Sequence, residues 1–318
     1  MITRCCSPRL RSLQMDRTFT IILNPVAGKG TAGARSEAIS SFFSSRGLTY
    51  SIVHTQYPGH AKELASSSIK NPDCTVIAAG GDGTCNEVIN GLLAGTPQQP
   101  PRFGVLPIGS GNDFSFGAGL PLSLNESLHS LLTGRETLID AGWVSVDNHE
   151  RVFFINGCGM GFDARVTYDA GNLRHLRGAA AYIYAAVKNL IIYPPAADIE
   201  VLLDDFSHRG TPALVCCMIG RRLGGSFLMA PRGDNKDGLF DVYMTHQHPR
   251  RIKMIGALLR YKKGTQDGHK DTIFQRTNKI SIRAVSGVLP IHADGETIST
   301  AGKQMEAACM PGALRVIG

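Results

Sequence analysis

The spacing of apolar and polar residues divides the chain into two parts that meet near residue 140. In the first part, short apolar runs alternate with stretches that have the length and periodicity of helices. The apolar runs lie at 18–25, 50–56, 74–81 and 102–111, and the helical stretches lie at 31–47, 59–70 and 85–93. Strands that alternate with helices are typical of a parallel sheet with helices on both faces. We therefore expect an α/β domain over residues 16–139.

The second part has the pattern of a β-rich domain. After residue 140 the apolar runs are short, and turn signals separate them. Two helical segments interrupt the strands, at 178–192 and 249–263. We expect one domain over residues 140–318, with its extreme C-terminus packing back on the first domain. Residues 1–15 precede the first strand. They are expected to be either a disordered arm or the result of a translation start assigned too far upstream.

The composition is that of an ordinary globular protein with a preference for anionic partners. Of the 318 residues, 43% are hydrophobic and 19% are charged, and the formal net charge is +7. No nucleic-acid-binding module is recognisable, so nucleic acid is not an expected partner. The eight cysteines include no Cys-x-x-Cys pair and lie mostly in apolar runs, which predicts buried free thiols and a reducing cytoplasm. No apolar run is long enough to span a bilayer.

Three glycine-rich turns follow strands of the first domain and form the candidate nucleotide site. They read NPVAGKG at 24–30, GGDGT at 80–84 and IGSGNDF at 108–114. Backbone N–H groups in such turns converge on anionic oxygens, and glycine lets the backbone come close to them. Because the carboxyl ends of parallel strands lie at one edge of a sheet, a single ligand crevice explains all three turns. An ordinary Asp-Gly turn is the alternative at Asp82.

In this order, the motifs resemble the diacylglycerol kinase catalytic-domain family of lipid kinases, to which sphingosine and ceramide kinases are related. The resemblance continues in INGCGMGFDA (155–164), MAPRGDNKDGLFDV (229–242) and IHADGE (291–296), so it covers nearly the whole chain from Thr18. It implies an α/β nucleotide-binding domain with a parallel sheet, like that of NAD kinases, followed by a β-sandwich domain that binds the lipid. It also implies Mg²⁺-dependent transfer of the γ-phosphoryl group of ATP to a lipid hydroxyl. Diacylglycerol is the first expectation for the acceptor, with phosphatidic acid as the product. The sequence does not fix the acceptor, and phosphatidylglycerol, a sphingoid base and an undecaprenyl-like alcohol stay open.

The resemblance extends to individual nucleotide-binding positions. They are Asn24, Gly28, Gly30, Gly81, Gly83, Thr84, Glu87, Gly109 and Ser110. Asp82 lies inside a phosphate loop, and Mg²⁺ prefers carboxylates and phosphate oxygens, so we expect Asp82 to hold the magnesium of the nucleotide. For Glu87 the alternative is an interaction with the dipole of its own helix.

Three further acids are candidates for the chemistry. The resemblance makes Asp294 the general base that accepts the proton of the lipid hydroxyl, and Glu296 an ionic partner near the metal. It places Asp113 in a water-linked network to the magnesium. From local sequence alone, Asp294 fits a hairpin turn, and Asp113 fits a cap on the residues that follow it. Phosphoryl transfer depends mainly on positioning and charge neutralisation, and this is work that carboxylates and magnesium can do.

The segment DNKDGLFD at 234–241 is the candidate site for a second magnesium ion. Its spacing lacks the regular acids and the distal glutamate of an EF-hand, which disfavours calcium sensing. The resemblance implies a structural magnesium bound by Asp234, Asp237 and the carbonyl oxygen of Leu239. A surface turn without metal is the alternative.

The segment 248–266 combines apolar and basic residues at helical spacing and is the candidate membrane contact. Its apolar positions are Ile252, Ile255 and Leu259, widened by Met254, Ala257 and Leu258. The basic residues Arg260, Lys262 and Lys263 lie near its end, and a basic amphipathic helix can dock on an anionic membrane surface. An ordinary helix with its apolar face in the core is the alternative. We expect a cytoplasmic enzyme that associates peripherally with membranes and meets its lipid acceptor there, and the sequence leaves a homodimer open.

Two other functions stay open. NAD kinase shares the Gly-Gly-Asp-Gly loop, although NPVAGKG and PIGSGNDF are features of lipid kinases. A catalytically silent regulatory protein that binds nucleotides is the second alternative. The presence of Asp82, Asp113, Asp294 and Glu296 argues against it.

Overall fold

The described residues of the computed structural model fall into two compact units. These residues are 17–30, 32–69, 71, 73–95, 97–173, 175–176 and 178–318. Unit 1 comprises the described residues up to Gly109, residues 119–138 and residues 314–318, and unit 2 comprises residues 110–118 and 139–313. The prediction for residues 1–15 lies outside the described residues.

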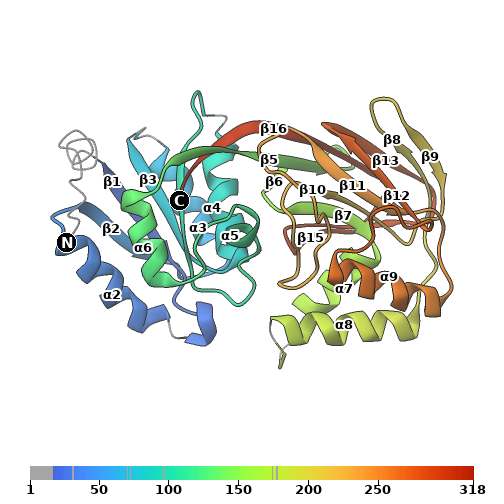
Figure 1. The fold of residues 1–318 in the computed structure, drawn as a ribbon, viewed down its shortest axis with the longest axis horizontal. Coiled ribbons are helices and arrows are strands. Elements are labelled where there is room, and N and C mark those ends of the chain that lie inside the picture. Colours follow the sequence, from blue (N-terminus) through green and yellow to red (C-terminus); the bar gives the residue numbers. More distant parts are fainter. Residues whose placement is uncertain are drawn as a thin grey trace, which may run out of the picture. The chain divides into compact units, whose positions relative to one another are not determined.

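Unit 1 is built on a parallel sheet with the strand order β2-β1-β3-β4 (Figure 1). The strands are β1 (Thr18–Leu23), β2 (Thr49–His54), β3 (Cys74–Gly80) and β4 (Arg102–Pro107). The helical elements are η1 (Ala27–Gly30), α2 (Ala32–Ser44), α3 (His60–Ser68), α4 (Asp82–Ala94) and α6 (Leu124–Thr133). Phe19 and Ile21 of β1 share one buried cluster with Phe43 of α2 and Leu128 of α6. Every residue of β3 is buried, as expected for a strand covered on both faces.

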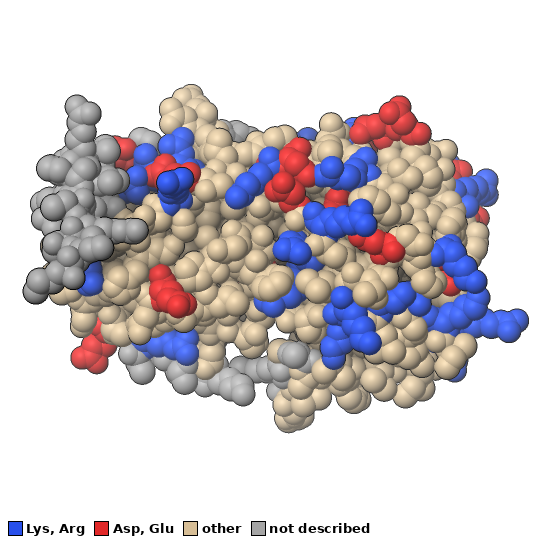
Figure 2. Space-filling model, in the orientation of Figure 1, with Lys and Arg blue, Asp and Glu red and all other residues tan. Residues whose placement is uncertain are grey.

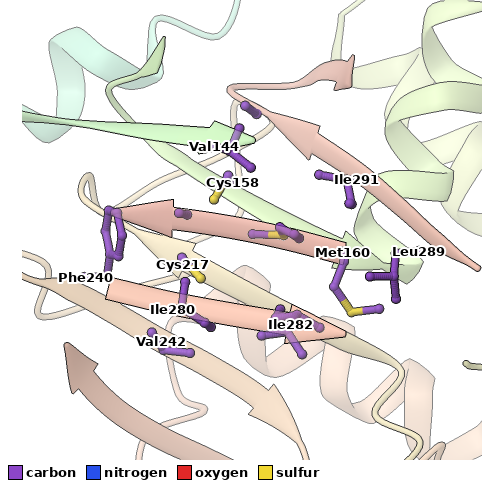
Figure 3. Close-up of a cluster of buried hydrophobic side chains, with 14 of the residues drawn as sticks. Val144, Cys158, Met160, Cys217, Phe240, Val242, Ile280, Ile282, Leu289 and Ile291 are labelled. Carbon is purple, nitrogen blue, oxygen red and sulfur yellow. The ribbon is translucent and has the colours of Figure 1, made fainter. Parts of the chain in front are cut away.

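Unit 2 is a β-sandwich of two antiparallel sheets. One sheet has the order β12-β11-β10-β7-β14-β15, and the other contains β16, β13, β8 and β9, with β5 beside β16 and β6 beside β5. The bounds are β5 (Glu136–Val146), β6 (Val152–Phe154), β7 (Gly157–Gly161), β8 (Asp198–Leu202), β9 (Ser207–Gly210), β10 (Leu214–Met218), β11 (Phe240–Thr245), β12 (Thr272–Thr277), β13 (Lys279–Ser286), β14 (Leu289–Ala293), β15 (Glu296–Gly302) and β16 (Gln304–Ile317). Met160, Cys217 and Val242 from the first sheet pack with Ile280 and Ile282 from the second in one buried cluster (Figure 3).

Three helices cover the outer face of the β7–β10–β11 region. They are α7 (Phe162–Gly171), α8 (Ala179–Ile192) and α9 (Arg251–Lys263), and a short helix α5 (Asp113–Gly117) also belongs to unit 2. Strand β10 serves both layers, because Val215 and Cys217 pack in the sandwich core while Leu214 and Cys216 pack against the helices. The expected fold class, a parallel α/β domain followed by a β-sandwich, is confirmed.

The C-terminal strand β16 contributes to both units. Its residues Gln304–Ala308 pair with β13, and Arg315 and Val316 pair in parallel with β4. Within the described residues, no helix is long and apolar enough to cross a membrane.

Several segments differ from the elements predicted from the sequence. Helix α6 and strands β9, β12 and β15 were not predicted. The apolar run that contains β6 and β7 is interrupted at residues 155–156 and leads directly into α7, which the sequence pattern did not predict. The N–H groups of Ile155 and Asn156 donate to the carboxylate of Asp294 instead of continuing a strand ladder. Helix α9 begins at Arg251, two residues later than expected, and ends as expected before Gly264, whose φ is 69°.

Candidate active site

The three glycine-rich loops meet at one edge of the sheet of unit 1. Asn24 Nδ2 donates to Thr84 Oγ1 at 3.1 Å, which joins the first loop to the second. The N–H groups of Ile108 and Gly109 both donate to the carbonyl oxygen of Gly80, at 2.8 and 3.1 Å, and join the third loop to the second. A Cβ atom on residue 80 would lie only 2.3 Å from Thr84 Oγ1, so the close approach of the loop to its helix requires glycine.

The second loop leads directly into the N-terminus of α4. Gly81 is the N-cap, Asp82 is the first helical residue, and Gly83 and Thr84 follow in the first turn. The first N–H groups of a helix have no intrahelical partner, and the helix dipole favours negative charge beside them. This turn therefore presents anion-binding N–H groups next to the half-buried carboxylate of Asp82.

The first loop forms a tight turn directly after β1. Gly28 and Gly30 lie in η1, and Gly28 has a positive φ of 58°. The N–H of Val26 donates to Asn24 Oδ1 at 3.1 Å and holds the start of the turn. Asn24 therefore fixes its own loop through one side-chain atom and reaches the second loop through the other.

Glu87 connects α4 to the beginning of α3. Its two carboxylate oxygens accept the N–H groups of Gly59 and Ala61, at 2.9 and 3.1 Å. Both N–H groups lie at the N-terminus of α3, where a carboxylate satisfies open donors and complements the dipole. The described contacts of Glu87 therefore place helix α3, and its predicted contact with the nucleotide stays a prediction.

The third loop is divided between the units, because Gly109 belongs to unit 1 and Ser110 to unit 2. Asp113, at the start of α5, is 4% exposed and pairs with Arg222, whose Nε lies 2.7 Å from Asp113 Oδ1. The N–H of Gly225 also donates to this carboxylate, at 2.9 Å to Oδ2. The guanidinium of Arg222 stacks over the ring of Phe116 at 4.1 Å from its centroid. The sequence analysis missed Arg222, which fixes the acid that we assigned to the magnesium network.

Asp294 is a buried carboxylate held by backbone donors. It is 6% exposed, and it accepts the N–H groups of Ile155, Asn156 and Gly157 at 2.8 to 3.0 Å. Its own backbone is left-handed, with a φ of 48°, as the predicted turn requires. Glu296 begins β15 two residues later and is exposed.

The loop expected to bind a structural magnesium is held by protein contacts. Asp237 Oδ1 accepts the N–H of Leu239 at 3.0 Å, and its other carboxylate oxygen pairs with Arg276. Asp234 Oδ1 accepts the N–H of Lys236 at 3.1 Å. Among the residues that the structure describes, no group of three or more His, Cys, Asp or Glu side chains is arranged to hold a metal ion. Arg276 neutralises Asp237 in this geometry, and the magnesium ion expected at Asp234, Asp237 and Leu239 stays a prediction.

Two buried acids, Asp140 and Asp241, lie close to these positions, and the sequence analysis assigned neither of them a role. Asp140 accepts the N–H groups of Gly238 and Gly312, at 2.7 and 2.8 Å, and so ties the loop to β16. Asp241 lies 3.1 Å from the Nε of Arg276. Burial raises the pKa of both carboxyl groups above the usual range for aspartic acid. Asp140 and the pair of Asp241 with Arg276 therefore help to hold the loop in place.

An apolar pocket opens between α7, α9 and the sheet of unit 2. It encloses about 610 Å³, a volume that includes its open mouth, and its wall contains Phe162, Leu214, Phe227 and Leu258. Gly295, the residue after Asp294, also lies on this wall. The pocket therefore reaches the residue that follows Asp294, for which the sequence predicts the role of base.

Helices α8 and α9 leave apolar side chains exposed. In α9, Met254 and Ala257 are buried, whereas Ile252 is 75% exposed, so the predicted apolar stripe is split between the core and the surface. The exposed large apolar residues of the two helices are Ile183, Tyr184, Val187, Ile191, Ile192, Ile252, Ile255 and Leu259. Lys and Arg side chains gather on the part of unit 2 that carries α9 (Figure 2), and those of α9 include the exposed Lys262 and Lys263.

Two family descriptions match consecutive parts of the chain. Residues 18–144 match the diacylglycerol kinase catalytic domain, and residues 157–318 match the YegS C-terminal NAD kinase beta sandwich-like domain. The chain belongs to the family of diacylglycerol kinase and YegS-like lipid kinases. The resemblance seen in the sequence motifs is thereby confirmed.

Curated relatives of this family member match it over most of their length. A diacylglycerol kinase of Bacillus subtilis (strain 168) is 28% identical over 278 residues, which are 87% of this chain and 88% of the relative. A Yersinia pestis (strain Pestoides F) protein named as a probable YegS-like lipid kinase is 27% identical over 85% of this chain and 87% of its own.

Solved structures show the same fold. A diacylglycerol kinase from Bacillus anthracis str. Sterne matches with a TM-score of 0.70 at 20% identity, over 95% of this chain and 96% of that one. Yeast NADH kinase matches with a TM-score of 0.51 at 12% identity, over 94% of this chain and 82% of its own. At these identities the likeness concerns the fold alone.

Proposed function

We propose that this lipid kinase family member transfers the γ-phosphoryl group of ATP to the hydroxyl of diacylglycerol and releases phosphatidic acid. The observation that carries the proposal is the apolar pocket of unit 2, whose wall includes Gly295 next to Asp294. Burying acyl chains against apolar side chains is favourable by about 25 cal/mol per Å². NAD, the alternative acceptor, is polar and charged and would gain little from such a wall.

ATP is proposed to bind at the three glycine-rich loops of unit 1. The N–H groups at the start of α4, from Gly81 to Thr84, would face phosphate oxygens. Asp82 would supply a carboxylate to the magnesium ion that accompanies ATP, and this ion would neutralise charge on the phosphates. One protein carboxylate beside a phosphate-binding turn fits that role, because phosphates and water commonly supply the other ligands of magnesium.

In the transfer step, the lipid hydroxyl oxygen forms a bond to the γ-phosphorus while the bond from that phosphorus to the bridging oxygen of ADP breaks. The hydroxyl proton passes to Asp294, whose carboxylate the three backbone donors position. A carboxylate is a weak base, but the hydroxyl becomes acidic only as transfer proceeds, so a weak base suffices. Asp113 and Glu296 are proposed to contribute negative charge near the metal, and neither is proposed to accept the proton.

The lipid is proposed to reach the enzyme at an anionic membrane surface that contacts α8 and α9. Ile191 of α8 and Ile252 of α9 are 68% and 75% exposed, and basic residues lie beside them on α9. Exposed apolar side chains enter the interfacial layer of a bilayer, and basic residues attract its anionic lipids. The combination of both features on adjacent helices supports a membrane contact.

The test of the function is an assay with radiolabelled ATP and magnesium, in which diacylglycerol in mixed micelles and NAD are offered as separate acceptors. We expect transfer to diacylglycerol and none to NAD. Asp82→Asn should reduce this transfer at least about 100-fold, because the loss of the carboxylate weakens the charge stabilisation in the transition state. Transfer to NAD alone, or wild-type turnover by Asp82→Asn, would contradict the proposal.

A further inference from the structure

One polar group on the wall of the apolar pocket has no hydrogen-bond partner in the part of the chain that the structure describes. Tyr261, in the last turn of α9, is 2% exposed and lines the pocket. Its hydroxyl forms no hydrogen bond with any residue that the structure describes. Burial raises the pKa of this phenol well above its ordinary value, so the hydroxyl keeps its proton and is available as a donor. A buried donor without a partner costs about 1–3 kcal/mol, which a ligand acceptor would recover.

A second polar group on the same wall is held in place by a buried histidine. Asp163, in the first turn of α7, lines the pocket, and its Oδ1 accepts the N–H of Ala164 at 2.9 Å. Its Oδ2 lies 3.1 Å from Nε2 of His292, whose side chain is fully buried in β14. Residue 159 must be glycine here, because a Cβ atom would lie 2.5 Å from Asp163 Oδ2. The fold thus makes room for this pair and fixes the carboxylate at the pocket wall.

Thr167 and Tyr182 also line the pocket, and the Tyr182 hydroxyl donates to the carbonyl oxygen of Gly295 at 3.4 Å. Tyr261, whose hydroxyl has no partner among the described residues, and Asp163, which is ionisable, favour different chemistry in a ligand. A phenol hydroxyl donates to a carbonyl oxygen, and a wrong ligand without that carbonyl leaves the donor unpaired. A carboxylate in an apolar pocket repels a ligand that carries its own negative charge. The wall therefore favours a ligand that is uncharged and carries a carbonyl.

We propose that Tyr261 and Asp163 select the acceptor lipid. The Tyr261 hydroxyl donates to a carbonyl oxygen beside the free hydroxyl of the acceptor, and the Asp163 carboxylate, positioned by His292, excludes anionic headgroups. This inference rests on the proposed lipid kinase function and restricts the range of lipids that can serve as the acceptor. Diacylglycerol and other neutral lipids with an ester or amide carbonyl fit, whereas phosphatidylglycerol carries a negative charge and a polyprenol has no carbonyl.

The decisive comparison uses two acceptors that differ only in their carbonyl groups. The full chain is assayed with each acceptor in mixed micelles. One acceptor is 1,2-dioctanoylglycerol, which has ester carbonyls, and the other is 1,2-dioctylglycerol, which has ether links instead. Tyr261→Phe should raise the KM for the ester about 3- to 10-fold and leave its kcat within about twofold. The KM for the ether should not change. Its melting temperature should be equal to or higher than that of the wild type, because the variant removes an unpaired buried hydroxyl.

Tyr243→Phe is the matched control. Tyr243 is also a fully buried tyrosine of unit 2, but its hydroxyl is bonded to Asp267 and does not line the pocket. The control variant should keep the preference of the wild type for ester over ether. An unchanged preference in Tyr261→Phe, or an equal loss in both variants, would overturn the role of Tyr261.

The proposed exclusion of anionic headgroups by Asp163 is tested with Asp163→Asn. The wild type should prefer diacylglycerol to phosphatidylglycerol by at least about tenfold in kcat/KM, and the variant should reduce that preference. Asp163→Ser, whose hydroxyl can still accept the N–H of Ala164, is the second variant if the first does not fold. An unchanged preference in a folded variant refutes the role of Asp163.

Binding separates this inference from the function on which it rests. A ligand that binds only the folded state raises the melting temperature, so the upward shift with dioctanoylglycerol reports binding without any transfer. If the wild type shows this shift, Tyr261→Phe should show a smaller one even when no phosphoryl transfer is detected. A protein that binds ester and ether lipids equally in this assay refutes the subsite, whereas absent transfer alone refutes only the kinase function.

Discussion

Asp294 combines two roles that the sequence could not separate. As the predicted base it must keep a carboxylate, and as a buried residue it must have partners for that charge. The three backbone donors from residues 155–157 supply those partners. The same contacts hold the interruption between β6 and β7, so any change at Asp294 also affects the local backbone.

Replacing Asp294 with asparagine should therefore lower stability as well as activity. The amide turns one acceptor oxygen into an NH₂ group, which then faces a backbone N–H. We expect the free energy of unfolding, measured by chemical denaturation, to fall by about 1–3 kcal/mol, and phosphoryl transfer to fall strongly at unchanged ATP affinity. Asp271→Asn, at a more exposed aspartate of the same unit, is the control and should change neither quantity. A stable but inactive Asp294→Asn would show that the carboxylate acts on the proton without supporting the backbone.

Helix α4 carries two acids with different tasks. Asp82 lies at its N-terminus beside the open N–H groups, whereas Glu87 lies one turn further along and accepts two N–H groups at the start of α3. The glycine loop that leads into α4 is thus supported from the side by a second helix. A change at Glu87 would reach the nucleotide site through the position of α3 and α4.

Removing the Glu87 side chain should separate this support from a direct contact with ATP. Glu87→Ala leaves two N–H groups at the start of α3 without their carboxylate, and we expect the free energy of unfolding to fall by about 1–2 kcal/mol. Glu63→Ala is the matched control, because Glu63 lies in α3 and bonds only an exposed tyrosine hydroxyl. If Glu87 acts through α3, ATP affinity measured well below the melting temperature should fall less than tenfold. A larger loss of ATP affinity in a protein of normal stability would instead support the direct contact expected from the sequence.

The parts of the site that the sequence predicted are those that act through their own backbone. Glycine and aspartate after a strand define a phosphate loop locally, so the loops around Gly28, Gly81 and Gly109 could be found without a structure. Arg222 could not, because its partner Asp113 lies 109 positions away and an arginine after a strand has no distinctive local pattern. The pair of Asp163 and His292 spans 129 positions and was missed for the same reason.

The two magnesium predictions differ in how much of their environment the local sequence determines. Asp82 needs only its own loop and the phosphates of a ligand, whereas the ion expected at Asp234 and Asp237 depends on which other side chains surround them. The structure places Arg276 beside Asp237, and the sequence of the loop gave no sign of that contact. Local spacing can suggest ligands for a metal, but it does not show which cation neutralises them.

No helix among the described residues could cross a membrane. The surface of unit 2 has features that suit contact with a lipid. Its exposed apolar residues gather on α8 and α9, and basic side chains gather over the same part (Figure 2). An ordinary helix with its whole apolar face in the core, the alternative left by the sequence, would have hidden Ile252, Ile255 and Leu259. The helix instead uses Met254 and Ala257 for the core and leaves the other face outside.

We expect binding of the protein to vesicles to depend on the charge of α9. The test is co-sedimentation with vesicles of phosphatidylcholine containing increasing phosphatidylglycerol, at low and high salt. Each basic residue close to an anionic surface contributes about 1 kcal/mol, so replacing Arg260, Lys262 and Lys263 with glutamine should weaken binding about 100-fold at low salt. High salt should reduce the difference, because it screens the attraction.

A control of equal charge separates this surface from the overall charge of the protein. The control replaces Lys279, Arg283 and Lys303 with glutamine, which also lowers the formal net charge from +7 to +4. These three residues are exposed, the first two on β13 and the third just before β16. If attraction follows net charge alone, both triple variants lose binding equally, and α9 has no special part in docking. If α8 and α9 form the contact, the control retains most of its binding. Ile191→Asn should then reduce binding although it changes no charge, because it removes an exposed apolar side chain from the interface.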